Sequence, residues 1–334
     1  MKKQPSLVDV ARRAKVNIST VSRTINQTGK IGAETQARVL KVMREMGYRP
    51  NRVARRLRAR DATTHLLGLI IPNIQNPFFA DLARGVEDVA YKHNYAVLLC
   101  NYDEDEAKER FYLDVMQAES VDGIILPPIH ESDEAVMQVV QAGTPVVCVD
   151  RSLSNSALDK VEVDNRRGAF IAVEHIISHG HRRIGLIAGP ADSSTGRERL
   201  QGCKDALVAA GLPVKAELTK FGDYKEGSGR QLAQELLSLA EPPSALFVSN
   251  GLMMIGALEA IAALGLKIPK QIALVGYDEL PLAAVFNPPL TLVKQPAYEV
   301  GKSAAELLLN RIEDPKRPPT SLKLQPELIV RKSC

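Results

Sequence analysis

Apolar residues follow two different periods along the chain, and the change between them divides the sequence. Before residue 47, apolar side chains recur every three or four positions, which is the spacing of amphipathic helices. From Leu66 onward, continuous apolar runs of four to seven residues alternate with amphipathic stretches. Such runs are typical of parallel strands that are buried on both faces. The pattern predicts a small all-α module followed by an α/β body.

Capping residues locate the first two helices of the module. Ser6 precedes the apolar run that begins at Leu7, and Asp9 lies three residues further on, as in a capping box. Asn17 can cap a second helix that runs from Ile18 to about Asn26. Two short helices joined by a turn of three or four residues are typical of a helix-turn-helix.

A third helix is expected from Glu34 to Met46, with Gly47 ending it. Its apolar face would close a small core with the first two helices, which cross at the small residue Ala11. The turn between those helices has Lys15 where glycine is common. This departure would weaken the helix-turn-helix prediction if it stood alone.

The segment after these helices, residues 50–60, reads PNRVARRLRAR and contains five arginines. Val53 and Leu57 are four residues apart, so a helix would place both on one face, and Pro50 suits its entry. A helix this short is marginal in water. We therefore predict a helix that forms only when a partner completes it; the alternative is a solvated charged linker.

Charge is distributed unevenly over the 334 residues, although the net charge is only +4. Residues 1–60 contain 16 Lys and Arg against 3 Asp and Glu, whereas the remainder contains 27 basic and 36 acidic residues. A strongly basic module on a mildly acidic body indicates an anionic polymer or a membrane surface as the partner of the first part alone. A plain three-helix bundle does not account for this charge. Short hydroxyls and an arginine on the second helix suit the phosphates and guanine edges of double-stranded DNA, which is our prediction.

The α/β body is predicted to form two doubly wound parallel-sheet lobes, rather than one eight-stranded barrel. The apolar runs fall into two clusters, the first opening near Leu66 and the second near Asp164. The predicted strands are LLGLIIP, AVLLC, GIILPP, PVVCVD, IGLIAG, ALFVSN, IALVGYD and TLVKQP.

Ligands of such folds bind beyond the carboxyl ends of the strands, and polar and aromatic residues gather there. The chain has only 15 Phe and Tyr residues and no Trp, so aromatic side chains at these positions are informative. Aromatic faces can cover a sugar ring, while carboxylates, amides and guanidinium groups can bind its hydroxyls. Each residue also has an ordinary explanation: the phenylalanines as core, Asp150 as a partner of Arg151, and Asp278 as a helix cap. The candidates at these strand ends are residues 73–79, Asp150, Arg151, residues 197–199, Tyr224, Asn250, Asp278 and Gln295.

Other classes of protein lack support in the sequence. No apolar run is long enough to span a membrane, and the N-terminus has no secretory h-region. The four cysteines are scattered and no histidine lies at metal-ligand spacing from them, so we predict a reducing cytoplasm and no metal site. A sugar dehydrogenase or kinase would need a glycine-rich nucleotide motif that is absent, so we predict no enzyme and no cofactor. The six histidines are interpreted as surface or helix-end residues, with His181 structural.

The run LVDVARRAKVNISTVSRTIN followed by GYRPNRVARRL resembles the DNA-binding headpiece and hinge of the lac repressor/gal repressor (LacI/GalR) family of bacterial transcription factors. The resemblance implies that the second helix reads bases in the major groove and that Leu57 wedges into the minor groove at the operator centre. The DNA-binding residues it implies are Ser6, Leu7, Ile18, Ser19, Thr20, Ser22, Arg23, Asn26, Asn51, Arg52, Ala54 and Leu57.

The body is similar to ribose-binding proteins, whose pentose site has NPFF, DR, RER, an aromatic, an Asn, an Asp and a late Gln in this order. The ligand residues that this resemblance implies are Asn76, Phe78, Phe79, Asp150, Arg151, Arg199, Tyr224, Asn250, Asp278 and Gln295. Gly251 departs from that pattern, since relatives usually have Asp there, and it would loosen the loop at Asn250. The resemblance implies a headpiece at 1–49, a hinge at 50–60 and an effector-binding core at 61–334. Within the core it implies lobe 1 at about 66–163 and 292–323, and lobe 2 at about 164–291 and 324–331.

This resemblance implies a homodimeric repressor of a sugar-utilisation operon, controlled by ribose or a similar monosaccharide. Sugar would close the lobes and destabilise the hinge helix on DNA, with induction favoured over co-repression. A phosphorylated sugar or a protein co-effector stays open as an alternative, as does a free-standing sugar carrier, which the headpiece argues against. The lac-type tetramer uses a leucine-heptad tail that this sequence lacks, so a dimer is expected.

Overall fold

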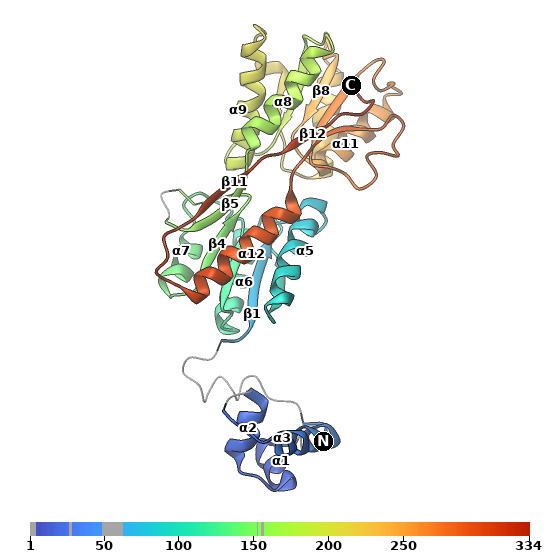
Figure 1. Ribbon diagram of the computed structural model, residues 1–334. Helices are drawn as coiled ribbons and strands as arrows, with labels where there is room; N and C mark the ends of the chain where they lie inside the picture. Colours follow the sequence, from blue (N-terminus) through green and yellow to red (C-terminus); the bar gives the residue numbers. More distant parts are fainter. Residues whose placement is uncertain (1–4, 27–28, 49–62, 152, 155–156) are drawn as a thin grey trace. The chain divides into compact units, whose positions relative to one another are not determined.

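The computed structural model describes residues 5–26, 29–48, 63–151, 153–154 and 157–334 (Figure 1). The chain divides into two units, Met1–Thr64 and His65–Cys334. The predicted hinge helix over 50–60, with the candidate residues Asn51, Arg52, Ala54 and Leu57, lies outside the described residues. Among the helices that are described, none is long and apolar enough to cross a membrane.

The N-terminal unit contains the three predicted helices, α1 (Leu7–Ala14), α2 (Ile18–Asn26) and α3 (Ala33–Met46). The capping box is present: Asp9 N–H donates to Ser6 Oγ at 3.3 Å, and Ser6 N–H donates to Asp9 Oδ2 at 2.9 Å. α3 ends at Gly47 with φ 61°, as predicted. The buried residues that close the core of the unit are Val10, Ala11, Ala14, Val21, Val39 and Val42.

Lys15 takes the glycine-like position in the turn between α1 and α2. Its φ is 53° and its N–H closes α1 on the carbonyls of Ala11 and Arg12. A lysine therefore adopts the left-handed conformation that glycine adopts at lower free energy. The turn thus forms with lysine in the glycine position. The presence of Lys15 therefore does not argue against a helix-turn-helix.

The second unit contains two six-stranded sheets, each covered by helices on both faces. The first, in the order β11-β5-β4-β3-β1-β2, has only parallel pairs and defines lobe 1. Its strands are β1 (Leu66–Ile71), β2 (Ala96–Asn101), β3 (Gly123–Leu126), β4 (Val146–Val149), β5 (Asp159–Val163) and β11 (Ser321–Leu324). Its helices are α5 (Pro77–Lys92), α6 (Glu106–Ala118), α7 (Glu134–Gln141) and α12 (Ala297–Glu313).

The second sheet, in the order β12-β10-β9-β8-β6-β7, defines lobe 2, and its strand β12 is antiparallel to β10. Its strands are β6 (Ile184–Ala188), β7 (Thr219–Phe221), β8 (Ala245–Val248), β9 (Ala273–Tyr277), β10 (Thr291–Lys294) and β12 (Glu327–Ile329). Its helices are α8 (Asn165–Ser178), α9 (Ser194–Ala209), α10 (Glu226–Leu237) and α11 (Gly251–Ala263), with a 3₁₀ turn, η1 (Ala216–Leu218), before β7.

Alternation along the strands explains the two-sided burial that the apolar runs predicted. In β1, Leu69 packs with α5 and α12 on one face, while the next residue, Ile70, packs with α6 and α7 on the other. In β8, Leu246 faces α10 and α11, and Phe247 faces α8 and α9. Each sheet thus contributes to two hydrophobic cores, which fixes the position of its carboxyl edge.

The crossing between lobes falls later than predicted. The expected boundary between residues 291 and 292 cuts through β10, which pairs with β9 through Leu292 and Gly276. Lobe 2 therefore continues to Lys294, and α12 then packs in the core of lobe 1. The TLVKQP run is a buried strand of the second sheet, so its hydrophobic contacts keep it in lobe 2.

Candidate functional site

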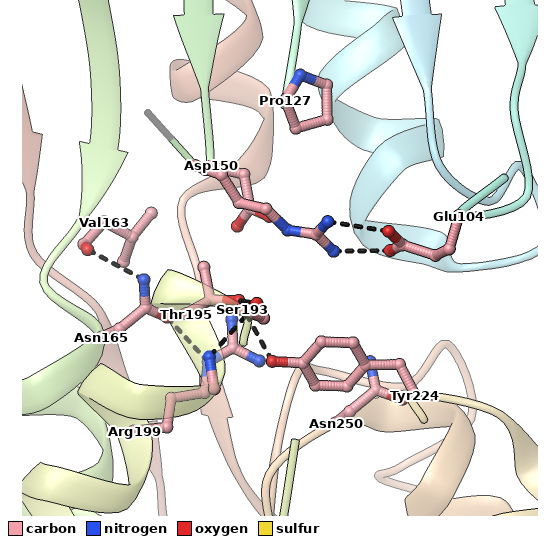
Figure 2. A network of polar contacts seen from close by, with 12 residues as sticks. Glu104, Pro127, Asp150, Val163, Asn165, Ser193, Thr195, Arg199, Tyr224 and Asn250 are labelled. Atoms are coloured by element: carbon pink, nitrogen blue, oxygen red, sulfur yellow. Dashed lines mark hydrogen bonds and ion pairs between the residues drawn. The ribbon is translucent and has the colours of Figure 1, made fainter. Parts of the chain in front are cut away.

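A cleft of about 710 Å³ lies at the carboxyl ends of strands from both lobes. This volume is within the usual range for small-molecule sites. Figure 2 shows Glu104 and Asp150 from lobe 1 facing Arg199, Tyr224 and Asn250 from lobe 2. All ten predicted ligand residues line it: Asn76, Phe78, Phe79, Asp150, Arg151, Arg199, Tyr224, Asn250, Asp278 and Gln295.

The aromatic wall of the cleft comes from the first turn of α5. Asn76 caps this helix, its Oδ1 accepting a hydrogen bond from Phe78 N–H at 3.0 Å, and Pro77 occupies the first turn. Phe78 and Phe79 meet edge to face, with ring centroids 4.9 Å apart. Both side chains are buried in the core of lobe 1 and also line the cleft. The core interpretation of these residues is confirmed, and their ligand role stays a prediction that their position in the cleft permits.

Three of the ten residues have left-handed backbone conformations, two of them (Asp150 and Asp278) directly after a strand and Tyr224 three residues after β7. Asp150 has φ 61°, Tyr224 has φ 63° and Asp278 has φ 74°. Residues other than glycine rarely adopt this conformation, which adds conformational free energy and is often found at binding sites. The conformation turns each side chain from the strand end into the cleft.

Arg151 is buried and held by a carboxylate that the sequence did not point to. Its Nη1 and Nη2 donate to Glu104 Oε2 at 2.8 Å and Oε1 at 2.5 Å, whereas Nε lies 3.8 Å from Asp150 Oδ2. The main partner is thus Glu104 and not Asp150, the pairing considered in the sequence. A bidentate pair fixes the plane of the guanidinium group.

Asp150 is almost fully buried. Opposing effects act on the pKa of its carboxyl group. Burial raises the pKa of its carboxyl group, the nearby Arg151 and Arg199 lower it, and Asp278 raises it, leaving a pKa of about 6. The carboxylate is therefore ionised at neutral pH but close to its titration range. It can accept hydrogen bonds from hydroxyl groups in the cleft.

Arg199 is buried in lobe 2 and oriented by residues outside the predicted set. Its Nε donates to Asn165 Oδ1 at 2.7 Å and its Nη1 donates to the Ser249 carbonyl at 2.8 Å. Its guanidinium carbon lies 3.9 Å from the centroid of the Tyr277 ring, in a cation–π contact. These contacts fix Arg199 before any ligand binds.

Asp278 organises the remaining wall of the cleft. Its Oδ1 accepts a hydrogen bond from Gln295 Nε2 at 2.6 Å, and its Oδ2 accepts from Gly251 N–H at 3.0 Å and from Asn250 Nδ2 at 3.3 Å. A Cβ at Gly251 would lie 3.2 Å from both Asp278 Cβ and a Leu280 methyl. Gly251 is therefore closely held and the expected loosening of the Asn250 loop is wrong, because the Asp278 carboxylate fixes that loop.

Tyr224 crosses the cleft floor with its hydroxyl group 3.1 Å from Thr195 Oγ1 (Figure 2). Its ring packs against Gly189, where an added Cβ would approach ring atoms to within 2.3–2.4 Å. The loop after β6 thus leaves the space that the tyrosine ring occupies. The ring is therefore held by this loop and by Thr195 where it lines the cleft.

Two buried polar atoms of the cleft lack a hydrogen-bond partner among the described residues, Arg151 Nε and Gln295 Oε1. Buried polar groups are nearly always paired, so this donor and this acceptor can each form a hydrogen bond with a polar molecule in the cleft. The charged residues lining the cleft comprise six acidic and three basic side chains, namely Asp103, Glu104, Asp150, Asp223, Glu226, Asp278, Arg151, Arg199 and Lys225. This balance disfavours a polyanionic ligand.

Several supporting residues were missed by sequence reasoning. Glu104 follows the AVLLC strand, so the rule of strand carboxyl ends would have found it had it been applied to that strand. Asn165, Thr195 and Tyr277 act through Arg199 and Tyr224, and only packing brings them together. No local pattern marks such residues.

The second predicted site lies on α2 of the N-terminal unit. Ser19 and Arg23 are exposed, and the apolar Ile18 is 46% exposed. Thr20 and Ser22 are partly buried, and Ser6 is exposed as the cap of α1. Leu7 instead packs against the core of the unit. α2 therefore presents a polar helix face with one apolar side chain, as a major-groove helix would.

Comparisons with known proteins identify the two parts of the chain. Residues 6–51 match the model of bacterial regulatory proteins of the lacI family, and residues 173–334 match a periplasmic binding protein-like domain. The HTH-type transcriptional repressor PurR of Aliivibrio salmonicida is 34% identical over 98% of both chains. Catabolite control protein A of Priestia megaterium is 36% identical over 91% of both chains.

Solved structures give the same picture. The lac repressor dimer bound to operator is 28% identical, with a TM-score of 0.86 over 99% of both chains. The transcriptional regulator CelR in complex with cellobiose is 32% identical, with a TM-score of 0.76 over 99% of this chain and 100% of that chain. A regulator from Enterococcus faecium with bound ribose is 29% identical, with a TM-score of 0.72 over 80% of this chain and 98% of its own.

Proposed function

Because the chain belongs to the LacI family of bacterial regulatory proteins, we propose that it represses a sugar-utilisation operon and that ribose or a similar monosaccharide controls it. The observation that carries this proposal is the convergence of ten predicted ligand residues in one cleft. The relatives named above are transcriptional regulators rather than enzymes.

The chemistry of the cleft favours a neutral, hydroxylated ligand. Six acidic side chains against three basic ones oppose a phosphorylated sugar, and two of the basic groups already have partners in Glu104 and Asn165. Phe78 and Phe79 can cover the C–H face of a sugar ring, while Asp150 and Asp278 accept from its hydroxyl groups. The regulators with bound ribose and with cellobiose support a sugar as the ligand.

Ligand binding would control DNA through closure of the lobes. Cleft residues come from both lobes, so a sugar that contacts both stabilises the closed arrangement over the open one. In the proposed homodimer, closure separates the two segments 50–60 and withdraws the partner contact that their helices need. One headpiece of each protomer would occupy one half-site of a pseudo-palindromic operator.

Calorimetry with a panel of neutral pentoses and hexoses, together with ribose 5-phosphate, tests the ligand class. We expect binding of one neutral sugar per chain, with ribose or a close relative the tightest, and no binding of the phosphate. Operator release by the same sugar, measured by fluorescence anisotropy, distinguishes induction from co-repression. If no monosaccharide binds, the assignment of the cleft is wrong; if only the phosphorylated sugar binds, the ligand class is wrong.

A further inference from the structure

The outer end of α8 presents two histidines beside a cysteine from the last segment of the sequence. His175 and His179 are one helical turn apart, so they lie on the same face. One ligand atom from each of His175, His179 and Cys334 lies within 4.8 Å of the others. Figure 1 shows the chain's C-terminal end near α8 in lobe 2. The cluster lies outside the cleft, since none of its residues lines it.

The hydrogen bonds of the two histidines leave Nε2 of each ring able to bind a metal. His175 Nε2 is buried and, in the described part of the chain, has no hydrogen-bond partner. His179 Nδ1 lies 2.9 Å from the His175 carbonyl, so Nδ1–H donates to it and Nε2 retains its lone pair. A backbone carbonyl that fixes the tautomer in this way is the usual outer-shell partner of a ligating histidine. The two rings lie 4.3 Å apart between centroids.

The third residue is held in place by its neighbour. Ser333 is fully buried, its Oγ donates to the Leu274 carbonyl at 2.6 Å, and the same Oγ accepts from Thr291 N–H at 2.8 Å. Leu274 N–H also donates to the Ser333 carbonyl at 2.8 Å. Cys334 is a free, half-buried cysteine directly after this anchor. Its thiol therefore stays near α8 without any metal.

We propose that His175, His179 and Cys334 form a site for a borderline-soft divalent cation such as Zn²⁺, with water as the fourth ligand. Imidazole nitrogen and thiolate sulfur are the ligands that Zn²⁺ prefers. Tetrahedral coordination places such ligand atoms about 3.3–3.7 Å apart. Side-chain rotations that move these atoms by roughly 1 Å would therefore complete the site. The ion would tie α8 to the segment after β12 and stabilise lobe 2.

Binding requires the loss of one proton from Cys334. Burial raises the pKa of this thiol to about 11, so it is protonated at neutral pH. The sulfur–metal bond forms as the S–H bond breaks and the proton passes to solvent. Affinity should therefore be greater where the thiolate forms more readily, since metal binding releases this proton.

The sequence predicted no metal site because no histidine lies near a cysteine along the chain. The fold brings these distant residues together. The histidines are on α8, before the first strand of lobe 2, whereas Cys334 follows its last strand. A structural role is the alternative interpretation of the two histidines, as helix-end residues packed against each other. That role leaves the buried Nε2 of His175 without a partner.

Titration of the full-length, metal-free protein with Zn²⁺ against a chromophoric chelator tests the proposal. We expect one Zn²⁺ per chain and a rise in Tm of roughly 5 °C when free Zn²⁺ is 100 times Kd. With Co²⁺ as the probe, a sulfur-to-metal charge-transfer band and tetrahedral d–d bands should appear. Mg²⁺ should give neither the shift nor competition.

Two variants and one matched control make the result specific. Cys334→Ser should abolish the charge-transfer band and weaken Zn²⁺ binding by about 100-fold, and His175→Asn should weaken it similarly. Cys100→Ser, which changes a half-buried cysteine of lobe 1, should bind as the unchanged protein does. Circular dichroism without metal checks that each variant is folded. Failure of Zn²⁺ to bind, or binding that survives Cys334→Ser undiminished, would overturn the site.

Discussion

Backbone strain is concentrated in the cleft at the level of single residues. Nine described residues other than glycine have positive φ, and five of them line the cleft: Asp103, Glu104, Asp150, Tyr224 and Asp278. Each conformation adds on the order of 1 kcal/mol to the folded state unless contacts offset it. At Asp278 the offsetting contacts are hydrogen bonds from Gln295 and Gly251.

The Glu104→Gln variant tests whether the new partner of Arg151 matters for binding. The bidentate ion pair would be replaced by a weaker neutral contact, so the guanidinium group would lose part of its orientation. We expect roughly tenfold weaker sugar binding, about 1.4 kcal/mol, by calorimetry. Glu106→Gln is the matched control, because Glu106 is exposed and bonds only His130 in the described contacts. Equal affinities of the two variants would contradict the positioning role.

Titration of Asp150 should make sugar binding depend on pH. Its folded-state pKa of about 6 lies above the ordinary value of 3.8, so the unliganded protein takes up a proton as the pH falls through 6. Sugar hydroxyls that donate to the carboxylate require the ionised form. We expect Kd to be constant above about pH 7 and to rise by up to tenfold per unit below pH 6.

The same carboxyl group affects stability in the opposite direction. A raised pKa means that Asp150 adds stability below pH 3.8 and that this contribution is lost as the pH rises through 6. Thermal unfolding of the unliganded protein should show a pH-dependent difference from Asp150→Asn in that window. For sugar binding, Asp150→Asn is also the control. If its Kd for the sugar rises below pH 6 as much as that of the unchanged protein, another group causes the pH dependence of binding.

At the scale of helices and strands, the close packing of two helix pairs depends on glycine. α5 and α12 approach so closely that a Cβ at Gly301 would lie 1.9 Å from the Leu82 carbonyl oxygen. α10 and α11 show the same feature, with a Cβ at Gly256 lying 2.0 Å from the Glu226 carbonyl oxygen. In each lobe, one such pair covers one face of the sheet.

Gly301→Ala should therefore destabilise lobe 1. The added methyl group cannot fit against backbone, so α12 must shift, and we expect a loss of about 2–3 kcal/mol in the free energy of unfolding. Gly227→Ala in α10 is the control, since a Cβ there meets no atom within 4 Å. Its helix propensity should leave stability unchanged or raise it by up to about 1 kcal/mol. Chemical denaturation of both variants without ligand measures the difference; equal midpoints would show that α12 moves freely.

At the scale of the whole molecule, the part proposed to bind DNA and the part proposed to bind the ligand carry opposite net charge. The first 60 residues have an excess of 13 basic groups, whereas the remainder has an excess of 9 acidic groups. DNA phosphates should attract the first part and repel the second, so the body stays off the DNA. Operator affinity should fall steeply with salt, by a slope of about −0.9 for each phosphate contacted.

Arg199→Ala and Leu57→Ala should separate ligand response from DNA binding. Arg199 is buried in the cleft, so its loss should weaken sugar binding by at least about tenfold and leave operator affinity intact. Leu57→Ala should reduce operator affinity and DNA bending more than non-specific binding, and leave sugar binding unchanged. Anisotropy with operator and calorimetry with sugar measure the two effects. Loss of both activities in either variant would contradict separate sites.

The sequence alone determined the features that depend on neighbours in the chain. Helix α1 followed from its cap and its apolar spacing, and all eight apolar runs became strands. Because parallel strands share a carboxyl edge, the polar residues after those runs identified the cleft before its shape was known. The short strands β5, β7, β11 and β12 were not among the predicted apolar runs, since segments such as DKVEV and SLKL alternate or are exposed.

Only the tertiary structure decided which distant residues act together. Three sets of contacts join segments that no local pattern relates. Glu104 binds Arg151, Asn165 and Tyr277 hold Arg199, and Cys334 lies beside two histidines. The crossing after Lys294 was likewise fixed by pairing of β10 with β9. Periodicity and capping act over a few residues, whereas these contacts depend on how two sheets and their helices pack. The chain sequence therefore located the cleft, and packing determined how its charged groups are held.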